Sequence, residues 1–182
     1  RGFHIFMRCL PLLQRLAPQA RVVVVGGDEV SYGIRLPAGD SYRQRLMAEL
    51  GERVDWTRVV FTGRLPYAQY LKVLQVSAVH AYLSYPFVLS WSLLEAMASG
   101  CCIVGSATPP VQEAIDDSVN GRLVDFFDSE ALAQQLADAL ARPAAMQPLR
   151  KAARQTVPER YDLKRVTLPA GLALLDRLAA GG

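Results

Sequence analysis

The sequence predicts a three-layer, Rossmann-like α/β fold in which helices cover both faces of a mainly parallel sheet. Short apolar runs at 21–25, 58–62, 79–83, 101–105 and 122–124 are bounded by Gly, Pro or polar residues, as strands buried on both faces are. Longer segments with helical periodicity separate them, as expected for crossover connections. With 182 residues, of which 51% are hydrophobic, the chain is long enough to bury a core as one domain.

The first helix is expected at 3–16, where apolar residues recur along one stripe. No strand precedes it in the sequence, although each helix of a parallel sheet follows a strand. We therefore expect a first strand upstream of residue 1, and we treat residues 1–182 as one domain of a longer protein.

The strand at 21–25 ends in Gly26-Gly27, but these glycines do not form a dinucleotide-binding motif, because the third glycine and an immediately following helix are absent. A loop follows. A capping-box pattern at Ser41–Gln44 then begins a helix that closes at Gly51 and whose role is packing.

The turn Gly63-Arg64-Leu65-Pro66 follows the strand at 58–62 and precedes a helix at 67–75. Ligands of doubly wound sheets bind beyond the carboxyl ends of the strands, so we expect this turn to face the same site as residues 84–92. Arg64 is either a phosphate ligand there or a solvated surface charge, since single arginines on turns are commonly solvated.

Residues 84–106 contain the most informative pattern of the chain. A helix expected at 91–99 stops at Gly100, as a helix end that needs a positive φ does. Because this helix begins just beyond a strand, the backbone N–H groups of Ser90, Trp91 and Ser92 are candidates for binding an anion such as phosphate.

Glu95 lies one turn into this helix and has two interpretations. Its carboxylate can accept two hydrogen bonds from a vicinal diol such as a ribose. Alternatively, Ser92-Leu93-Leu94-Glu95 matches a capping box, in which the glutamate only stabilises the helix start. The spacing favours neither over the other.

Beyond the central stretch, Pro109-Pro110 permits a short helix before a turn at 116–121. A helix at 129–141 is expected to be capped by Ser129. The tract 144–179 is expected to be helical but irregular, because Pro148, Pro158 and Pro169 interrupt it.

Four motifs in this order resemble the C-terminal, donor-binding half of family-four, group-one glycosyltransferases of the GT-B fold. They are LEAMASG at 94–100, CCIVGS at 101–106, VQEAI at 111–115 and NGRLV at 120–124. The resemblance covers nearly the whole chain. It implies the donor half of a retaining, metal-independent enzyme that uses a nucleotide-diphosphate sugar, with an acceptor-binding N-terminal domain outside this chain.

The resemblance also implies roles for individual residues. The family carries two glutamates separated by seven residues; Glu95 matches the second, which holds the ribose, whereas Phe87 stands at the first, which faces the sugar. Arg1-Gly2 matches a Lys-Gly pair whose cation contacts the diphosphate. The turn around Leu65 is expected to meet the base through main-chain groups, with Arg64 near the phosphates. No catalytic nucleophile is assigned; Glu113 is either near the site or a helix cap.

Composition excludes several other functions. A formal charge of +3, spread evenly, does not indicate nucleic-acid binding. The three cysteines cannot form a disulfide framework and indicate a reducing compartment. The two histidines lack partners at metal-ligand spacing, so no metal is expected. No apolar run is long enough for a membrane span and no signal peptide is found. We expect a cytoplasmic domain, and leave open a membrane-peripheral location of the full-length protein.

Three functions remain in competition. The first is the donor-binding domain of a glycosyltransferase, which needs no cofactor besides its nucleotide-sugar substrate and is expected to be inactive without its acceptor domain. The second is a sugar-nucleotide epimerase on the same fold, which Phe87 keeps open. The third is a nucleotide-binding module without turnover.

Overall fold

The computed structural model describes residues 2–30, 34 and 36–180, and it confirms the α/β class. Strands β1 (Val22–Val25) and β2 (Val59–Gly63) pair in parallel, while β3 (Val79–Tyr82), β4 (Cys102–Ser106) and β5 (Arg122–Val124) form a parallel sheet in the order β3-β4-β5. All five strands were expected from their apolar runs. Among the described residues the strands form two parallel sheets, because β1 and β3 are not hydrogen-bonded to each other.

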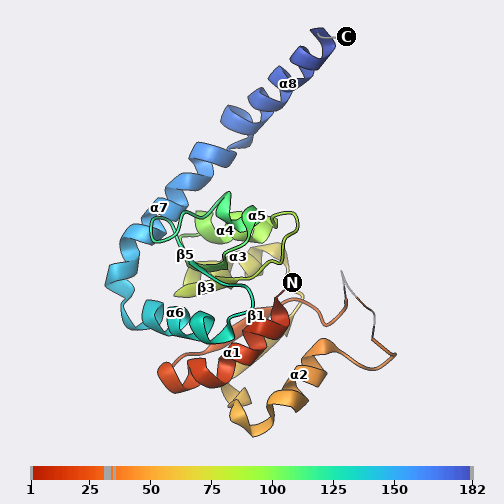
Figure 1. Ribbon diagram of the computed structural model, residues 1–182, viewed down its shortest axis with the longest axis vertical. Coiled ribbons are helices and arrows are strands. Elements are labelled where there is room, and N and C mark those ends of the chain that lie inside the picture. Colours follow the sequence, from red (N-terminus) through yellow and green to blue (C-terminus); the bar gives the residue numbers. More distant parts are fainter. Residues whose placement is uncertain (1, 31–33, 35, 181–182) are drawn as a thin grey trace.

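Helices cover both faces of the strands, as Figure 1 shows. Helices α1 (Phe3–Leu16) and α6 (Ser129–Ala141) pack together on one face. On the other lie α3 (Tyr67–Val76), α4 (Trp91–Ala98) and α7 (Pro143–Tyr161). Two further helices are α2 (Tyr42–Leu50) and the single turn α5 (Pro109–Gln112).

Strand β4 lies at the centre of this arrangement. All five of its residues are buried, and two successive side chains join different hydrophobic clusters. Val104 joins the cluster formed by α1 and α6, whereas Ile103 joins the one formed by α3, α4 and α7. This period of two is what a strand covered on both faces requires.

Two helix starts were predicted from capping residues, with different outcomes. Ser41 caps α2 by accepting a hydrogen bond from the Gln44 N–H at 3.1 Å, as predicted. For α6 the prediction of Ser129 is wrong by one residue. Asp128 is the N-cap, and its carboxylate accepts from the Ala131 N–H at 2.8 Å. Serine and aspartate are both good N-cap residues, and here the helix begins at Ser129, which leaves Asp128 at the capping position.

The C-terminal tract is more regular than expected. Helix α7 runs through Pro148 and Pro158 without interruption. Each proline removes one backbone hydrogen bond, to the carbonyl of Ala144 or Arg154, but both of those residues are exposed, so water can take the place of the missing donor. A π-helical turn (Leu163–Thr167) leads into α8 (Leu168–Ala180), which extends away from the domain in Figure 1.

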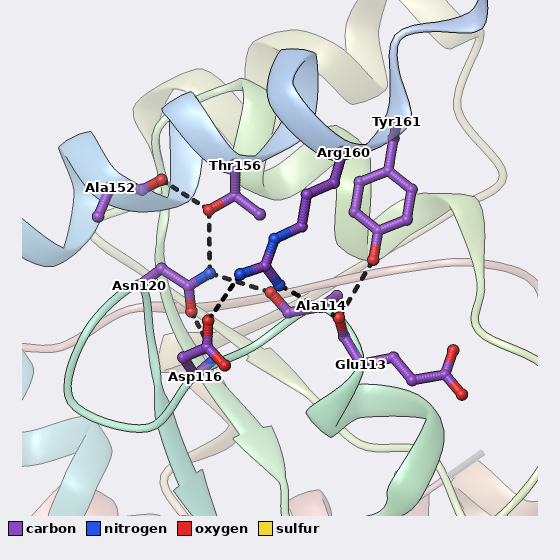
Figure 2. Close-up of polar contacts among 8 residues, drawn as sticks. All are labelled: Glu113, Ala114, Asp116, Asn120, Ala152, Thr156, Arg160 and Tyr161. Carbon is purple, nitrogen blue, oxygen red and sulfur yellow. Dashed lines mark hydrogen bonds and ion pairs between the residues drawn. The ribbon is translucent and has the colours of Figure 1, made fainter. Parts of the chain in front are cut away.

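A cluster of polar contacts fixes α7 to the turn at 114–121 (Figure 2). The Asn120 side chain, 2% exposed, donates to the Ala114 carbonyl and to the Thr156 hydroxyl, both at 3.0 Å, and accepts from the Asp116 N–H at 2.8 Å. Nearby, Arg160 forms an ion pair with Asp116 at 3.0 Å. The buried amide satisfies groups from both segments, so it determines how the helix sits on the turn.

Candidate functional site

The loop after β3 begins with a buried network of hydroxyl groups. The Ser84 N–H donates to the Ser106 hydroxyl at 3.0 Å, and the hydroxyls of Ser106 and Thr108 both donate to the Ser84 carbonyl at 2.9 Å. The three residues stand at the carboxyl ends of β3 and β4. The network therefore fixes the place where the chain leaves the sheet toward α4.

Three of the candidate residues lie together at the start of α4. Ser90 is the N-cap: its backbone N–H donates to the Tyr82 hydroxyl at 2.9 Å, and its own hydroxyl lies 2.9 Å from that of Ser92. Trp91 follows with a side chain that is 81% exposed. The N–H groups of Ser90 and Ser92 thus already donate to hydroxyls, and the two serine hydroxyls with the positive end of the helix dipole are what this helix start offers an anionic ligand.

The capping-box interpretation of Glu95 is wrong. Helix α4 starts at Trp91 with Ser90 as its cap, so Glu95 is the fifth helical residue, and the Ser92 N–H points to the Ser90 hydroxyl. The Glu95 carboxylate instead accepts a hydrogen bond from the hydroxyl of Tyr67, at 3.0 Å. Tyr70, also on α3, lies close enough for the same carboxylate to raise the pKa of its hydroxyl.

Tyr67 is a residue of this site that was not among the sequence candidates. It is the first residue of α3, directly after the turn that follows β2. The hydrogen bond to Glu95 raises the pKa of the Tyr67 hydroxyl, because the carboxylate stabilises the protonated phenol. The sequence signal that could have identified Tyr67 is its position directly after Pro66, in the turn that follows a predicted strand. The contact also brings the turn 63–66 beside α4, as the shared strand edge predicted.

A hollow of about 280 Å³ opens beside this pair. Tyr67, Leu71, Glu95, Ser99 and Arg154 contribute to its walls, so a carboxylate, two hydroxyls and a guanidinium converge on one space. Arg154 comes from α7 and was not among the sequence candidates. Gln75 and Ala98 also line the hollow, so it extends along α3 and α4 toward their C-terminal ends, away from the carboxyl ends of the strands.

The turn after β2 is shaped by Gly63, whose φ of +67° favours glycine. Its carbonyl accepts from the Gly26 N–H at 2.9 Å. Leu65 is half-buried, while the Arg64 side chain is 78% exposed and lies 3.4 Å from the Glu29 carboxylate. The guanidinium is thus in solvent, in an exposed ion pair of the kind that contributes little to stability.

Phe87 and Gly2, the neighbour of the candidate Arg1, lie near the same edge. Arg1 is outside the described residues, but its neighbour Gly2 packs against the end of β3: a Cβ atom at Gly2 would lie 2.3 Å from the Leu83 Cβ. Phe87 stands in the loop between β3 and α4 with 49% of its surface exposed, so it is not part of the sheet core. Glu113 ends α5, and its carbonyl accepts from Tyr161 while its carboxylate points away from α7 in Figure 2.

Metal and thiol chemistry have no candidates among the described residues. No group of three or more His, Cys, Asp or Glu there could hold a metal ion. Cys9, Cys101 and Cys102 are buried and unbridged. Burial raises the pKa of Cys9 to about 12 and that of Cys101 to about 11, which keeps both thiols protonated and unreactive. Within residues 2–30, 34 and 36–180, no helix is both long and apolar enough to cross a membrane.

The fold and the site define a Rossmann-like domain with a polar site at the strand carboxyl ends. Residues 1–156 match the family model described as "Glycosyl transferases group 1". The chain belongs to this family. No sequence among the curated proteins matches it significantly.

Solved structures of similar fold include three informative cases. HepE from Anabaena in complex with UDP superposes with a TM-score of 0.79 at 20% identity, over 99% of this chain and 45% of that one. Sucrose-phosphate synthase from Thermosynechococcus elongatus gives 0.75 at 26% identity, over 96% and 43%. The C-terminal domain of LpcC, a group 1 family protein from Francisella tularensis, gives 0.74 at 19%, over 90% and 81%. The chain thus spans less than half of the first two proteins.

Proposed function

We propose that residues 1–182 bind the nucleotide-diphosphate sugar of a glycosyltransferase that transfers the sugar to an acceptor with retention. The observation that carries the proposal is the Glu95 carboxylate, presented at the start of α4 and held there by Tyr67. Family membership supports transfer from a sugar nucleotide. The similar HepE structures contain UDP or UDP-glucose, which makes a uridine nucleotide the first ligand to test.

Each candidate residue has a part in this proposal. Glu95 accepts hydrogen bonds from the ribose hydroxyls, and the helix start at Ser90, Trp91 and Ser92 binds a phosphate. The main chain of Gly63–Leu65 meets the base. Arg64 exchanges its exposed Glu29 partner for the diphosphate, and Arg1 provides a second cation. Together the cations and the helix start stabilise the charge on the leaving diphosphate, an electrostatic contribution to catalysis. No metal and no additional cofactor enters the proposed reaction.

The acceptor is proposed to bind between this domain and a further domain of a longer protein. Phe87 would then face the donor sugar from the loop after β3. An aromatic side chain there offers an apolar surface where the family motif has a carboxylate, so the proposed site lacks the acidic hydrogen-bond acceptor on the sugar side. We therefore expect the 182-residue chain to bind the nucleotide but not to transfer sugar.

Nucleotide binding by calorimetry tests the role of Glu95. In Glu95→Gln the side chain keeps its size and loses its charge, and hydrogen bonds to charged groups contribute about 1.5–3 kcal/mol. The affinity for UDP should therefore fall about tenfold to a hundredfold. The matched control is Glu130→Gln, which removes a carboxylate from α6 on the opposite face and should leave binding unchanged.

A ligand change completes the test. 2′-Deoxy-UDP should bind the parent chain more weakly than UDP does. For Glu95→Gln the difference in affinity between the two nucleotides should be much smaller, since the ligand change and the substitution delete the same hydrogen bond. Equal discrimination by the two proteins would remove Glu95 from the ribose site. Absence of nucleotide binding by the parent chain would refute the donor-domain function and favour an interaction module without turnover.

Phe87 favours one alternative, a sugar-nucleotide epimerase on the same fold. Its aromatic ring replaces the sugar-facing carboxylate of the family motif, and it is exposed at the site rather than packed in the core. Product analysis with a longer protein that includes the acceptor side distinguishes the two functions. Transfer releases a nucleoside diphosphate and lengthens the acceptor, whereas epimerisation yields an isomeric sugar nucleotide.

A further inference from the structure

Two tyrosines of α3 lie beside the Glu95 carboxylate of α4. Tyr67 and Tyr70 are three residues apart, a spacing that places side chains on one face of a helix. Their ring centroids are 6.2 Å apart, and the ring planes are tilted by 39°. The Tyr67 hydroxyl donates to Glu95 Oε1 at 3.0 Å, whereas Tyr70 lies near the same carboxylate without such a bond. One carboxylate therefore has two phenol groups beside it.

The two phenols are in different environments. The Tyr67 side chain is exposed. The Tyr70 ring packs against the hydrophobic cluster that contains Leu93 and Met97 of α4, and its hydroxyl oxygen is buried with no hydrogen-bond partner in the part of the chain that the structure describes. Burial raises the pKa of Tyr70, and the charge of Glu95 raises it further, so the phenol keeps its proton at neutral pH. The Tyr70 hydroxyl is thus a buried donor without an acceptor.

An unpaired polar group in the interior lowers the stability of a folded protein and is uncommon, so the Tyr70 hydroxyl requires an explanation. The titratable groups that act on it are Glu95, Tyr67 and Cys101. The Cys101 thiol donates to the Leu74 carbonyl at 3.1 Å and, when protonated, is a weak acceptor. The Tyr67 hydroxyl is already bonded to Glu95. The Glu95 carboxylate is therefore the strongest acceptor of the three.

The Glu95 carboxylate has room for Tyr70 as well as for a ribose. An ionised carboxylate has two oxygens and about four lone-pair positions. In the proposed donor complex two ribose hydroxyls and the Tyr67 hydroxyl occupy three of these positions. The remaining position matches the one nearby donor that has no partner, the hydroxyl of Tyr70.

We propose that Tyr70 is a positioning residue for the ribose site, whose buried hydroxyl donates to Glu95 when the nucleotide is bound. The inference rests on the proposed function, in which Glu95 binds the ribose, and adds how the carboxylate is oriented. A ribose on the solvent side orders the carboxylate against α3, where the buried hydroxyl lies. Tyr70 therefore lowers the stability of the unliganded domain and raises its affinity for the nucleotide.

Tyr70→Phe tests this pair of opposite effects, because it keeps the ring in the hydrophobic cluster and deletes only the hydroxyl. Without nucleotide, the melting temperature should rise by roughly 2–4 °C, since an unpaired buried group is removed. In calorimetry, UDP affinity should fall about threefold to tenfold, the value of one hydrogen bond. The difference in affinity between UDP and 2′-deoxy-UDP should shrink, because a less well oriented Glu95 gains less from the 2′-hydroxyl.

The matched control is Tyr161→Phe, which makes the same chemical change at a tyrosine packed against the same hydrophobic cluster. The Tyr161 hydroxyl lies 3.4 Å from the Glu113 carbonyl, as Figure 2 shows, and not beside Glu95. Its removal should lower the melting temperature slightly, since a hydrogen bond is lost, and should leave the affinities for UDP and 2′-deoxy-UDP unchanged.

A double substitution shows whether Tyr70 acts through Glu95. If it does, adding Tyr70→Phe to Glu95→Gln should change UDP affinity by less than about twofold, because the carboxylate that the hydroxyl orients is already gone. A purely structural effect of Tyr70 would instead lower the affinity of the double variant by the full factor seen in the single variant.

Two results would overturn this inference while leaving the proposed function intact, provided that the parent chain binds UDP and Glu95→Gln binds it more weakly. One is a Tyr70→Phe variant that binds UDP as tightly as the parent chain does. The other is a Tyr70→Phe variant that melts at a lower temperature and loses the same factor in affinity for UDP and for 2′-deoxy-UDP. Absence of UDP binding by the parent chain would overturn the proposed function and this inference together.

Discussion

Replacement of Asn120 by alanine should destabilise the domain more than any change on the surrounding turn. The substitution removes three hydrogen bonds and leaves the Ala114 carbonyl and the Asp116 N–H without their partner (Figure 2). Thr156 keeps its bond to the Ala152 carbonyl. At about 1 kcal/mol for each bond lost, the free energy of unfolding should fall by about 3 kcal/mol. For a chain of this length the melting temperature should fall by roughly 6–12 °C.

Urea unfolding followed by circular dichroism measures this loss. The matched control is Val119→Ala, one residue earlier in the same turn and 61% exposed, which should change stability by less than about 0.5 kcal/mol. Thr156→Val removes one of the three bonds, so its effect and that of Asn120→Ala should not add in the double mutant. A loss for Asn120→Ala no larger than that of the control would refute the assignment of α7 docking to this amide.

The remaining predictions concern the site and the thiols. Tyr67→Phe deletes the hydroxyl that holds Glu95 and should weaken UDP binding on the order of threefold while reducing discrimination against 2′-deoxy-UDP; unchanged discrimination in calorimetry would show that Tyr67 does not position the carboxylate. Because burial raises the pKa of Cys9 and Cys101 to about 12 and about 11, and also raises that of Cys102, the thiolate is scarce below those values. At pH 8 a thiol reagent should label none of the three in the folded protein and all of them in urea, and rapid labelling without urea would contradict their burial.

Elements that depend on local pattern were predicted well from the sequence. The helix at 3–16 matches the observed bounds, because its apolar stripe and its neighbours define both ends. The five strand runs were found for the same reason: a strand buried on both faces is a continuous apolar segment. The failures at Pro148 and Pro158 also have a local origin. A rule for helix interiors was applied at positions where Ala144 and Arg154, the residues whose carbonyls lose a donor, are exposed, so water can replace it.

Contacts between residues far apart in the sequence could not be predicted from local sequence patterns. Tyr67 and Glu95 lie on different helices and are 28 residues apart in the sequence, so no rule of local spacing predicts their hydrogen bond. The docking of Thr156 on Asn120 joins residues 36 apart. Rejecting the capping-box interpretation of Glu95 also required the structure, because only the backbone shows that Ser90 rather than Ser92 caps the helix.

The loop that carries Phe87 is attached to the domain at both of its ends. Ser84 is bonded to Ser106 and Thr108, and the Ser90 N–H is bonded to the Tyr82 hydroxyl. Phe87, between these ends, is half exposed and contributes little to the core. A change of side chain at Phe87 can therefore alter the surface offered to a ligand while the anchors keep α4 and Glu95 in place. In the proposed donor site this separates recognition of the sugar, which depends on the loop, from recognition of the nucleotide, which depends on the anchored helix.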